Sequence, residues 1–132
     1  MFPPCISIPT ISGALDAISA AARAYARGGY FVVMDGIFGT RVAAERIRST
    51  VGVPTHYIVL RPTVETALSR AEKRNTKVFN DTAIIRELYQ KFVGLGEFET
   101  HTLDTSVLSV PETLEAVRGA LAAGTFRLAD CC

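Results

Sequence analysis

Two continuous apolar runs, rich in β-branched and aromatic residues, constrain this chain most. The first covers residues 30–34 (YFVVM) and ends at Asp35-Gly36. The second covers residues 56–60 (HYIVL) and ends at Arg61-Pro62. Such runs are typical of strands that are buried on both faces, as in parallel sheets. A third, shorter strand is predicted over residues 99–104.

Helical patterns lie between and around these strands. Helices are predicted over residues 12–27, 40–51, 82–93 and about 110–123, and a further helix begins after Thr63. Thr63, Asp81 and Ser109 stand where N-cap side chains are expected, and Ser109 and Glu112 have the spacing of a capping box. Strands that alternate with crossover helices indicate a parallel sheet covered on both faces. The predicted fold class is therefore α/β, a three-layer sandwich with a short parallel sheet.

Composition narrows the possible partners. The chain has 132 residues and a formal net charge of +1, which gives no electrostatic case for nucleic acid or an anionic membrane. No apolar run approaches the about 20 residues of a membrane span. Residues 1–11 lack the basic start of a signal peptide, and Cys5, Cys131 and Cys132 have no disulfide or metal-ligand spacing. We expect an irregular lead-in at 1–11, one domain at 12–128, a tail at 129–132 and a cytoplasmic location.

Polar side chains follow the carboxyl ends of all the predicted strands. In open α/β sheets, ligands bind outside these ends. The helix after the second strand adds two arginines four residues apart, which share one helical face. The resulting candidate site contains Asp35, Arg61, Arg70, Arg74, Asp104, Thr105 and Ser106. Arginines and acids together suit a metal-bound phosphate ligand.

Plainer interpretations of the same residues stay open. Arg70 and Arg74 can belong to a solvated helix face that pairs with Glu72 or another acid. Asp35 can be a strand-end turn residue, and Asp104 with Thr105 can form an Asx or Thr turn.

Several segments resemble small P-loop kinases, the group of chloramphenicol phosphotransferase-like, zeta-toxin-like and nucleotide-kinase-related proteins. The segments are YFVVMDG, VLRPTVETALSRAEKR, IIRELYQKF, and LDTS followed by PETLEAVRGAL, within residues 30–128. The resemblance implies a P-loop NTPase-like fold and ATP-dependent phosphoryl transfer to a small hydroxyl substrate, with ATP and Mg²⁺ as cofactors. A nucleotide and a small molecule would then be the partners.

The resemblance also implies roles for individual residues. Arg70 and Arg74 match lid arginines that contact the adenine face and the transferring phosphates, and residues 75–79 would be the lid. Asp35 matches a Walker B-like or substrate-side acid that would hold the metal. Thr105 and Ser106 lie where the family's last loop passes the nucleotide base, beside Arg61 and Asp104.

One departure from the family is large. The motif GxxxxGK[ST], whose backbone amides and lysine cradle phosphates, does not occur in the sequence. We therefore expect an N-terminally truncated member whose first strands are missing, with ATP binding that is weak or lost. Such a chain should expose a sheet edge or an apolar patch. The alternative function is an inactive remnant that serves as a binding or oligomerisation module, with homo-oligomers formed through the uncovered edge.

Overall fold

The computed structural model describes residues 11–37, 41–51, 53–74 and 81–129. The elements are, in chain order, α1 (Ile11–Arg27), α2 (Arg41–Val51), β1 (Val59–Leu60), α3 (Val64–Glu72), α4 (Thr82–Gln90), the 3₁₀ helix η2 (Gly96–His101), β2 (Thr102–Leu103) and α5 (Val110–Ala123).

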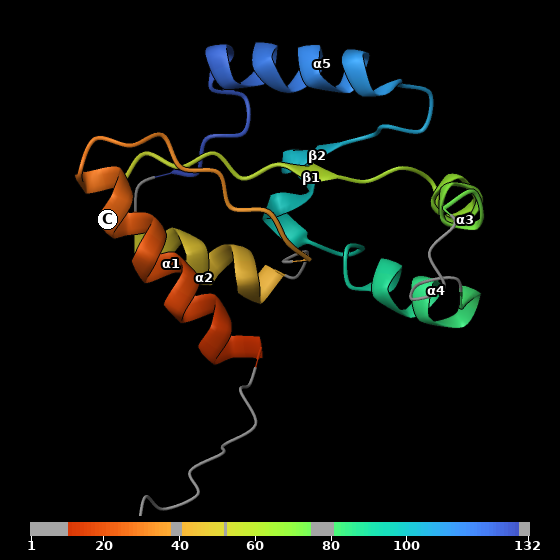
Figure 1. Ribbon diagram of the computed structural model, residues 1–132, viewed down its shortest axis with the longest axis horizontal. Helices are drawn as coiled ribbons and strands as arrows, with labels where there is room; N and C mark the ends of the chain where they lie inside the picture. Colours follow the sequence, from red (N-terminus) through yellow and green to blue (C-terminus); the bar gives the residue numbers. More distant parts are fainter. Residues whose placement is uncertain (1–10, 38–40, 52, 75–80, 130–132) are drawn as a thin grey trace, which may run out of the picture.

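The sheet is short and parallel. Val59 pairs with Thr102 and Leu60 with Leu103. The two strands lie between α5 on one side and α1, α2 and α4 on the other, with α3 at the end of β1 (Figure 1). The predicted α/β class, with a parallel sheet between helical layers, is confirmed at this level.

The C-terminal segment pairs with the residues that directly precede β1. His56 forms an antiparallel bridge with Arg127, through bonds that join residues 55 and 57 to residues 128 and 126. The end of the domain is thereby fixed next to the start of the strand that leads to the candidate site.

The main hydrophobic core lies under this part of the strand. It is built by α1, α2, η2 and the strand, and its buried members are Leu15, Ala43, Ala44, Ile47, Tyr57, Val59, Leu95, Phe98 and Leu128. Small alanines on α2 let α1 and α2 approach closely, because an alanine side chain extends little beyond the helix backbone. None of the described helices combines the length and the apolar character that crossing a membrane requires.

The predicted helix caps are confirmed. The side chain of Thr63 accepts from the Thr66 amide at the start of α3, and that of Asp81 accepts from the Ala83 amide at the start of α4. Ser109 begins α5 with a complete capping box with Glu112. These caps form because their hydrogen bonds are local and satisfy amides that a helix start leaves unpaired.

The predicted strand over residues 30–34 is wrong for this structure. The segment is extended but forms no strand with any described residue, and Phe31 is 83% and Val33 77% exposed. Its β-rich composition favours extended backbone, but a strand also needs a neighbouring edge with which to pair, and none meets it here.

Other predicted elements are shorter than expected. Of the second strand, predicted over residues 56–60, only Val59–Leu60 forms a strand, and His56 forms an isolated bridge. Of the third strand over residues 99–104, only Thr102–Leu103 is β structure, because η2 takes up the residues before it. The helix predicted over residues 82–93 ends at Gln90, where the bonds change to the 3₁₀ type and Gly94 follows with φ +71°.

Gly124 and Gly119 offer a matched test of the end of α5. Gly124 caps the helix at φ +69°, whereas Gly119 lies inside the helix, and a Cβ atom would meet nothing within 4 Å at either position. We expect Gly124→Ala to destabilise the fold by about 1–2 kcal/mol, since a side chain is strained at positive φ. Gly119→Ala should stabilise it by about 0.5–1 kcal/mol.

Urea denaturation of the two variants measures both free energies of unfolding. Equal effects of the two substitutions would contradict the assignment of Gly124 as a left-handed cap.

Candidate functional site

A cavity of about 1050 Å³ lies beside the carboxyl ends of the strands. Its walls come from α3, α4, α5 and the loop after β2. Most of its lining is apolar and includes Leu60, Ile85, Leu88, Tyr89, Phe92, Leu108, Val110, Leu114 and Val117. The charged residues in this lining are Arg61, Arg70 and Arg74, with no carboxylate among the described lining residues.

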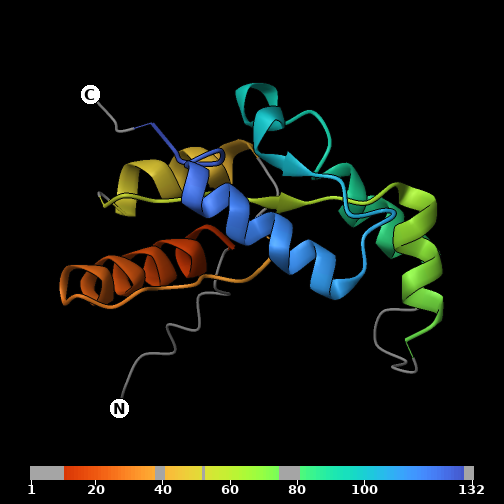
Figure 2. The same ribbon diagram turned by 90° about the horizontal axis from the view of Figure 1, so that it is seen from above.

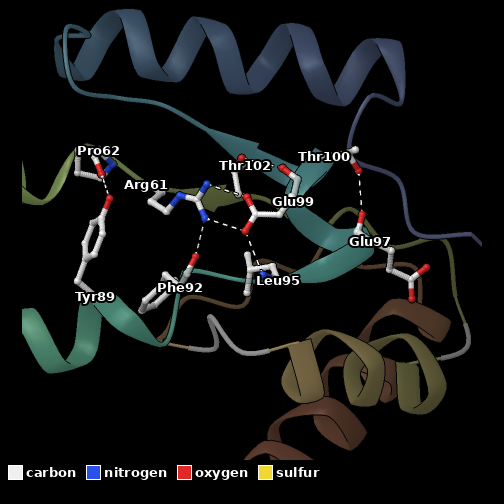
Figure 3. A network of polar contacts seen from close by, with 9 residues as sticks. All are labelled: Arg61, Pro62, Tyr89, Phe92, Leu95, Glu97, Glu99, Thr100 and Thr102. Carbon is white, nitrogen blue, oxygen red and sulfur yellow. Dashed lines mark hydrogen bonds and ion pairs between the residues drawn. The ribbon is translucent and has the colours of Figure 1, made fainter.

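Arg61 is fixed by an ion pair and a backbone contact (Figure 3). Its guanidinium donates to both carboxylate oxygens of Glu99, at 2.8 and 3.1 Å, and to the Phe92 carbonyl at 2.6 Å. The Leu95 amide also donates to Glu99, at 3.0 Å. One pair therefore joins the end of β1, the end of α4 and the start of η2.

The same contacts shift the pKa values of both Arg61 and Glu99. The hydrogen bonds from Arg61 and from the Leu95 backbone lower the pKa of Glu99 to about 2. The bond to Glu99 raises the pKa of Arg61. Arg61 is thus a charged cavity residue with three of its five N–H donors engaged by protein acceptors.

Arg70 connects α3 to the loop after β2. Its guanidinium donates to the Thr105 carbonyl at 2.6 Å and to the Thr105 hydroxyl at 3.2 Å. It also lies 3.5 Å from the Leu108 carbonyl. Thr105 is buried under this contact. The arginine therefore shapes the cavity wall by holding the loop in place.

Arg74 lies four residues further on, past the end of α3 at Glu72, and lines the same cavity. The prediction that Arg70 and Arg74 share a helical face is therefore wrong, because the helix ends before Arg74, although both side chains line one cavity. Arg74 is exposed, and its guanidinium has no hydrogen-bond or ion-pair partner among the described residues. It is the cavity arginine in this part of the chain with donors open to a ligand.

Asp104 and Ser106 form the turn that the plainer interpretation anticipated. Asp104 accepts hydrogen bonds from the amide and the hydroxyl of Ser106, which lower the pKa of the carboxyl. The Ser106 hydroxyl in turn accepts from the Thr63 amide at 2.8 Å. A smaller cavity of about 230 Å³ next to this turn is lined by Asp104, Tyr89 and Arg61, among others. The turn holds the loop after β2 against the start of α3.

Asp35 does not join the other predicted residues. It is exposed and does not line the cavity, although Ile37, two residues further on, does. Because residues 30–34 form no strand, nothing carries Asp35 to the edge where Arg61 and Asp104 lie. The lid predicted at 75–79 lies outside the described residues.

The described residues fit Mg²⁺ poorly. No group of three or more His, Cys, Asp or Glu side chains that could hold a metal ion is present among them. Mg²⁺ can be held by one or two carboxylates together with substrate phosphates. Here, however, Asp104 is engaged by Ser106 and Asp35 does not line the cavity, so the described residues offer no prepared magnesium site.

The sequence did not predict that residues of α4 and just after it line the cavity, or that Glu99 binds Arg61. Tyr89 and Phe92 belong to an apolar stripe that reads as core, but they line the cavity, and the Tyr89 hydroxyl donates to the Pro62 carbonyl at 2.7 Å. Glu99 is 38 residues from Arg61 in sequence, and no local spacing signals this pair. Only the tertiary fold brings these groups together.

Neither a scan against protein-family models nor a search of curated proteins gives a match for this chain.

The ion pair between Arg61 and Glu99 leads to a pH-dependent prediction. Because the folded-state pKa of Glu99 is lowered, its contribution to stability is complete above its ordinary pKa of 4.5 and is lost as the pH falls through about 2. We expect Glu99→Gln to destabilise the fold by about 1 kcal/mol at neutral pH. The difference from the wild type should shrink between these two pKa values.

Chemical denaturation at a series of pH values measures this difference. Glu97→Gln is the control, because its contact with Arg48 is longer, at 3.7 Å, and more exposed. A Glu99→Gln effect that stays constant down to pH 2 would show that the ion pair is not its origin.

Proposed function

We propose that this chain is a nucleotide-binding domain of the phosphotransferase type, related to small P-loop kinases, that binds a phosphate-bearing nucleotide in the cavity beside β1 and β2. The observation that carries the proposal is the charge of the cavity. Its described lining combines apolar walls with arginines and lacks a carboxylate. This combination favours a ligand that has a flat apolar part and an anionic part.

The cavity has separate regions for the two parts of such a ligand. Tyr89 and Phe92 offer aromatic rings on the α4 side for contact with a base, and the hydrogen bond to Pro62 restrains the Tyr89 ring. Arg74 supplies open donors for a phosphate group. The size also fits, since pockets for small molecules are commonly about 300–1,000 Å³.

The three cavity arginines have different roles, which the sequence did not indicate. Arg61 and Arg70 bind protein groups and keep the walls in place, so their charge acts on the ligand without direct donation. Arg74 is the direct phosphate contact. Thr105 and Ser106 hold the loop after β2 against α3, through the Arg70 guanidinium and the Thr63 amide.

Binding is better supported than phosphoryl transfer. Transfer of the γ-phosphoryl group from ATP to a small hydroxyl substrate needs a phosphate cradle, and the sequence contains no GxxxxGK[ST] motif. ATP fits the cavity chemistry, whereas Mg²⁺ finds no prepared set of ligands among the described residues. The second candidate, a binding or oligomerisation module without catalysis, is favoured by the internal use of Arg61 and Arg70.

Titration of the chain with ATP and with ADP, followed by calorimetry, tests the proposal. We expect weak binding that Arg74→Ala reduces about tenfold or more, since a charge-assisted hydrogen bond contributes about 1.5–3 kcal/mol. The matched control is Lys73→Ala, because Lys73 is exposed on the same turn but does not line the cavity.

Two results would count against a nucleotide site here. One is the lack of any heat of binding at millimolar ATP. The other is an equal loss of affinity in Arg74→Ala and Lys73→Ala, which would indicate general charge attraction.

A further inference from the structure

The chain that contains β1 forms its backbone hydrogen bonds along one edge. The Tyr57 amide donates to the Phe126 carbonyl at 2.9 Å, the Leu128 amide to the Thr55 carbonyl at 2.9 Å, and the Arg61 amide to the Leu103 carbonyl at 3.0 Å. Alternate residues of an extended chain direct their N–H and C=O groups to the same side. The backbone groups of Ile58 and Leu60 therefore face the opposite side, where no described residue pairs with them.

An unpaired extended segment runs on that opposite side. In Figure 2, β2 lies on one side of β1 and residues 30–37 run on the other. Tyr30, Phe31 and Val33 are 67%, 83% and 77% exposed, whereas the alternate residues Val32 and Met34 are half-buried. Within the described part of the chain, each copy thus carries both a strand edge and an apolar extended segment that have no backbone partner.

We propose that these two features bind each other between two copies of the chain. In this reciprocal dimer, residues 30–34 of each copy add as a strand to the free edge of β1 in the other. Exchange of identical elements is a low-cost route to two-fold dimers, and exposed edges are templates for strand addition.

The start of the segment is attached to the end of α1. The Tyr30 amide donates to the Tyr25 carbonyl at 3.1 Å, and the two rings pack edge to face at 5.8 Å. These contacts hold the start of the segment at the end of α1. Within one copy, Ile37 and Leu60 line the same cavity, yet the described residues 30–37 form no backbone hydrogen bond with β1.

Charge complementarity sets the direction of the added strand. Asp35 follows the apolar run directly, so a strand parallel to β1 places the partner's Asp35 at the carboxyl end of β1. That end borders the cavity, where Arg74 has open donors and no carboxylate lies in the described lining. The second copy thereby supplies an acid that the cavity lacks. The consequence for ligand binding rests on the proposed function, whereas the dimer itself does not.

Sedimentation equilibrium without nucleotide tests the dimer directly. We expect the wild-type chain to form dimers and both Phe31→Glu and Leu60→Lys to be monomeric, because each puts a charge into the new sheet. Val107→Glu is the matched control and should dimerise like the wild type, since Val107 is 91% exposed but lies in the loop before α5. Circular dichroism checks that all variants remain folded.

A charge exchange tests the direction of the strand. Asp35→Arg and Arg74→Asp should each weaken dimerisation about tenfold or more, because each places like charges together. The double variant should recover most of the loss. Hydrogen exchange of the Ile58 and Leu60 amides should slow as the wild-type protein becomes dimeric.

Three outcomes would overturn the inference. The first is a wild-type chain that stays monomeric at the highest concentration that can be prepared. The second is a dimer that persists in both Phe31→Glu and Leu60→Lys, which would show another interface. The third is slow exchange of Ile58 and Leu60 in a monomer, which would show that the segment pairs within its own chain. Because no nucleotide is present, failure of the dimer is distinguishable from failure of ATP binding.

Discussion

The ion pair between Arg61 and Glu99 is the contact on which the geometry of the candidate site depends. Arg61 follows β1 directly, and Glu99 lies in η2 just before β2, so the pair fixes the two strand segments beside each other. Its further bonds to the Phe92 carbonyl and the Leu95 amide hold the end of α4 at the same point. A planar guanidinium suits this task because it can donate to several acceptors at fixed angles.

Around this contact, the arginines of the cavity serve different purposes. Arg70 holds the loop after β2 through the Thr105 backbone, and Arg61 holds α4 and η2, so both maintain the cavity in which Arg74 keeps its donors open. A cationic cavity with apolar walls follows from this division. The lack of a carboxylate in the described lining strengthens the field that an anionic ligand would meet.

The backbone pairing around β1 is also one-sided. The strand through residues 55–61 uses one edge for the C-terminal segment and for β2, and it leaves the other edge open beside an exposed apolar segment. A parallel sheet is stable when its strands are paired and covered on both faces. Among the described residues, Tyr30, Phe31 and Val33 belong to an extended segment that pairs with no strand, which leaves their side chains exposed.

The sequence by itself determined the features that depend on near neighbours. The caps at Thr63, Asp81 and Ser109 could all be predicted, since each involves residues within about one helical turn. The parallel relation of the two short strands also followed from the alternating pattern. The tertiary structure alone decided which extended runs became strands and which side chains line the cavity. Residues 30–34 have strand composition but find no edge, and Glu99 meets Arg61 across 38 residues, because pairing and burial depend on distant parts of the chain.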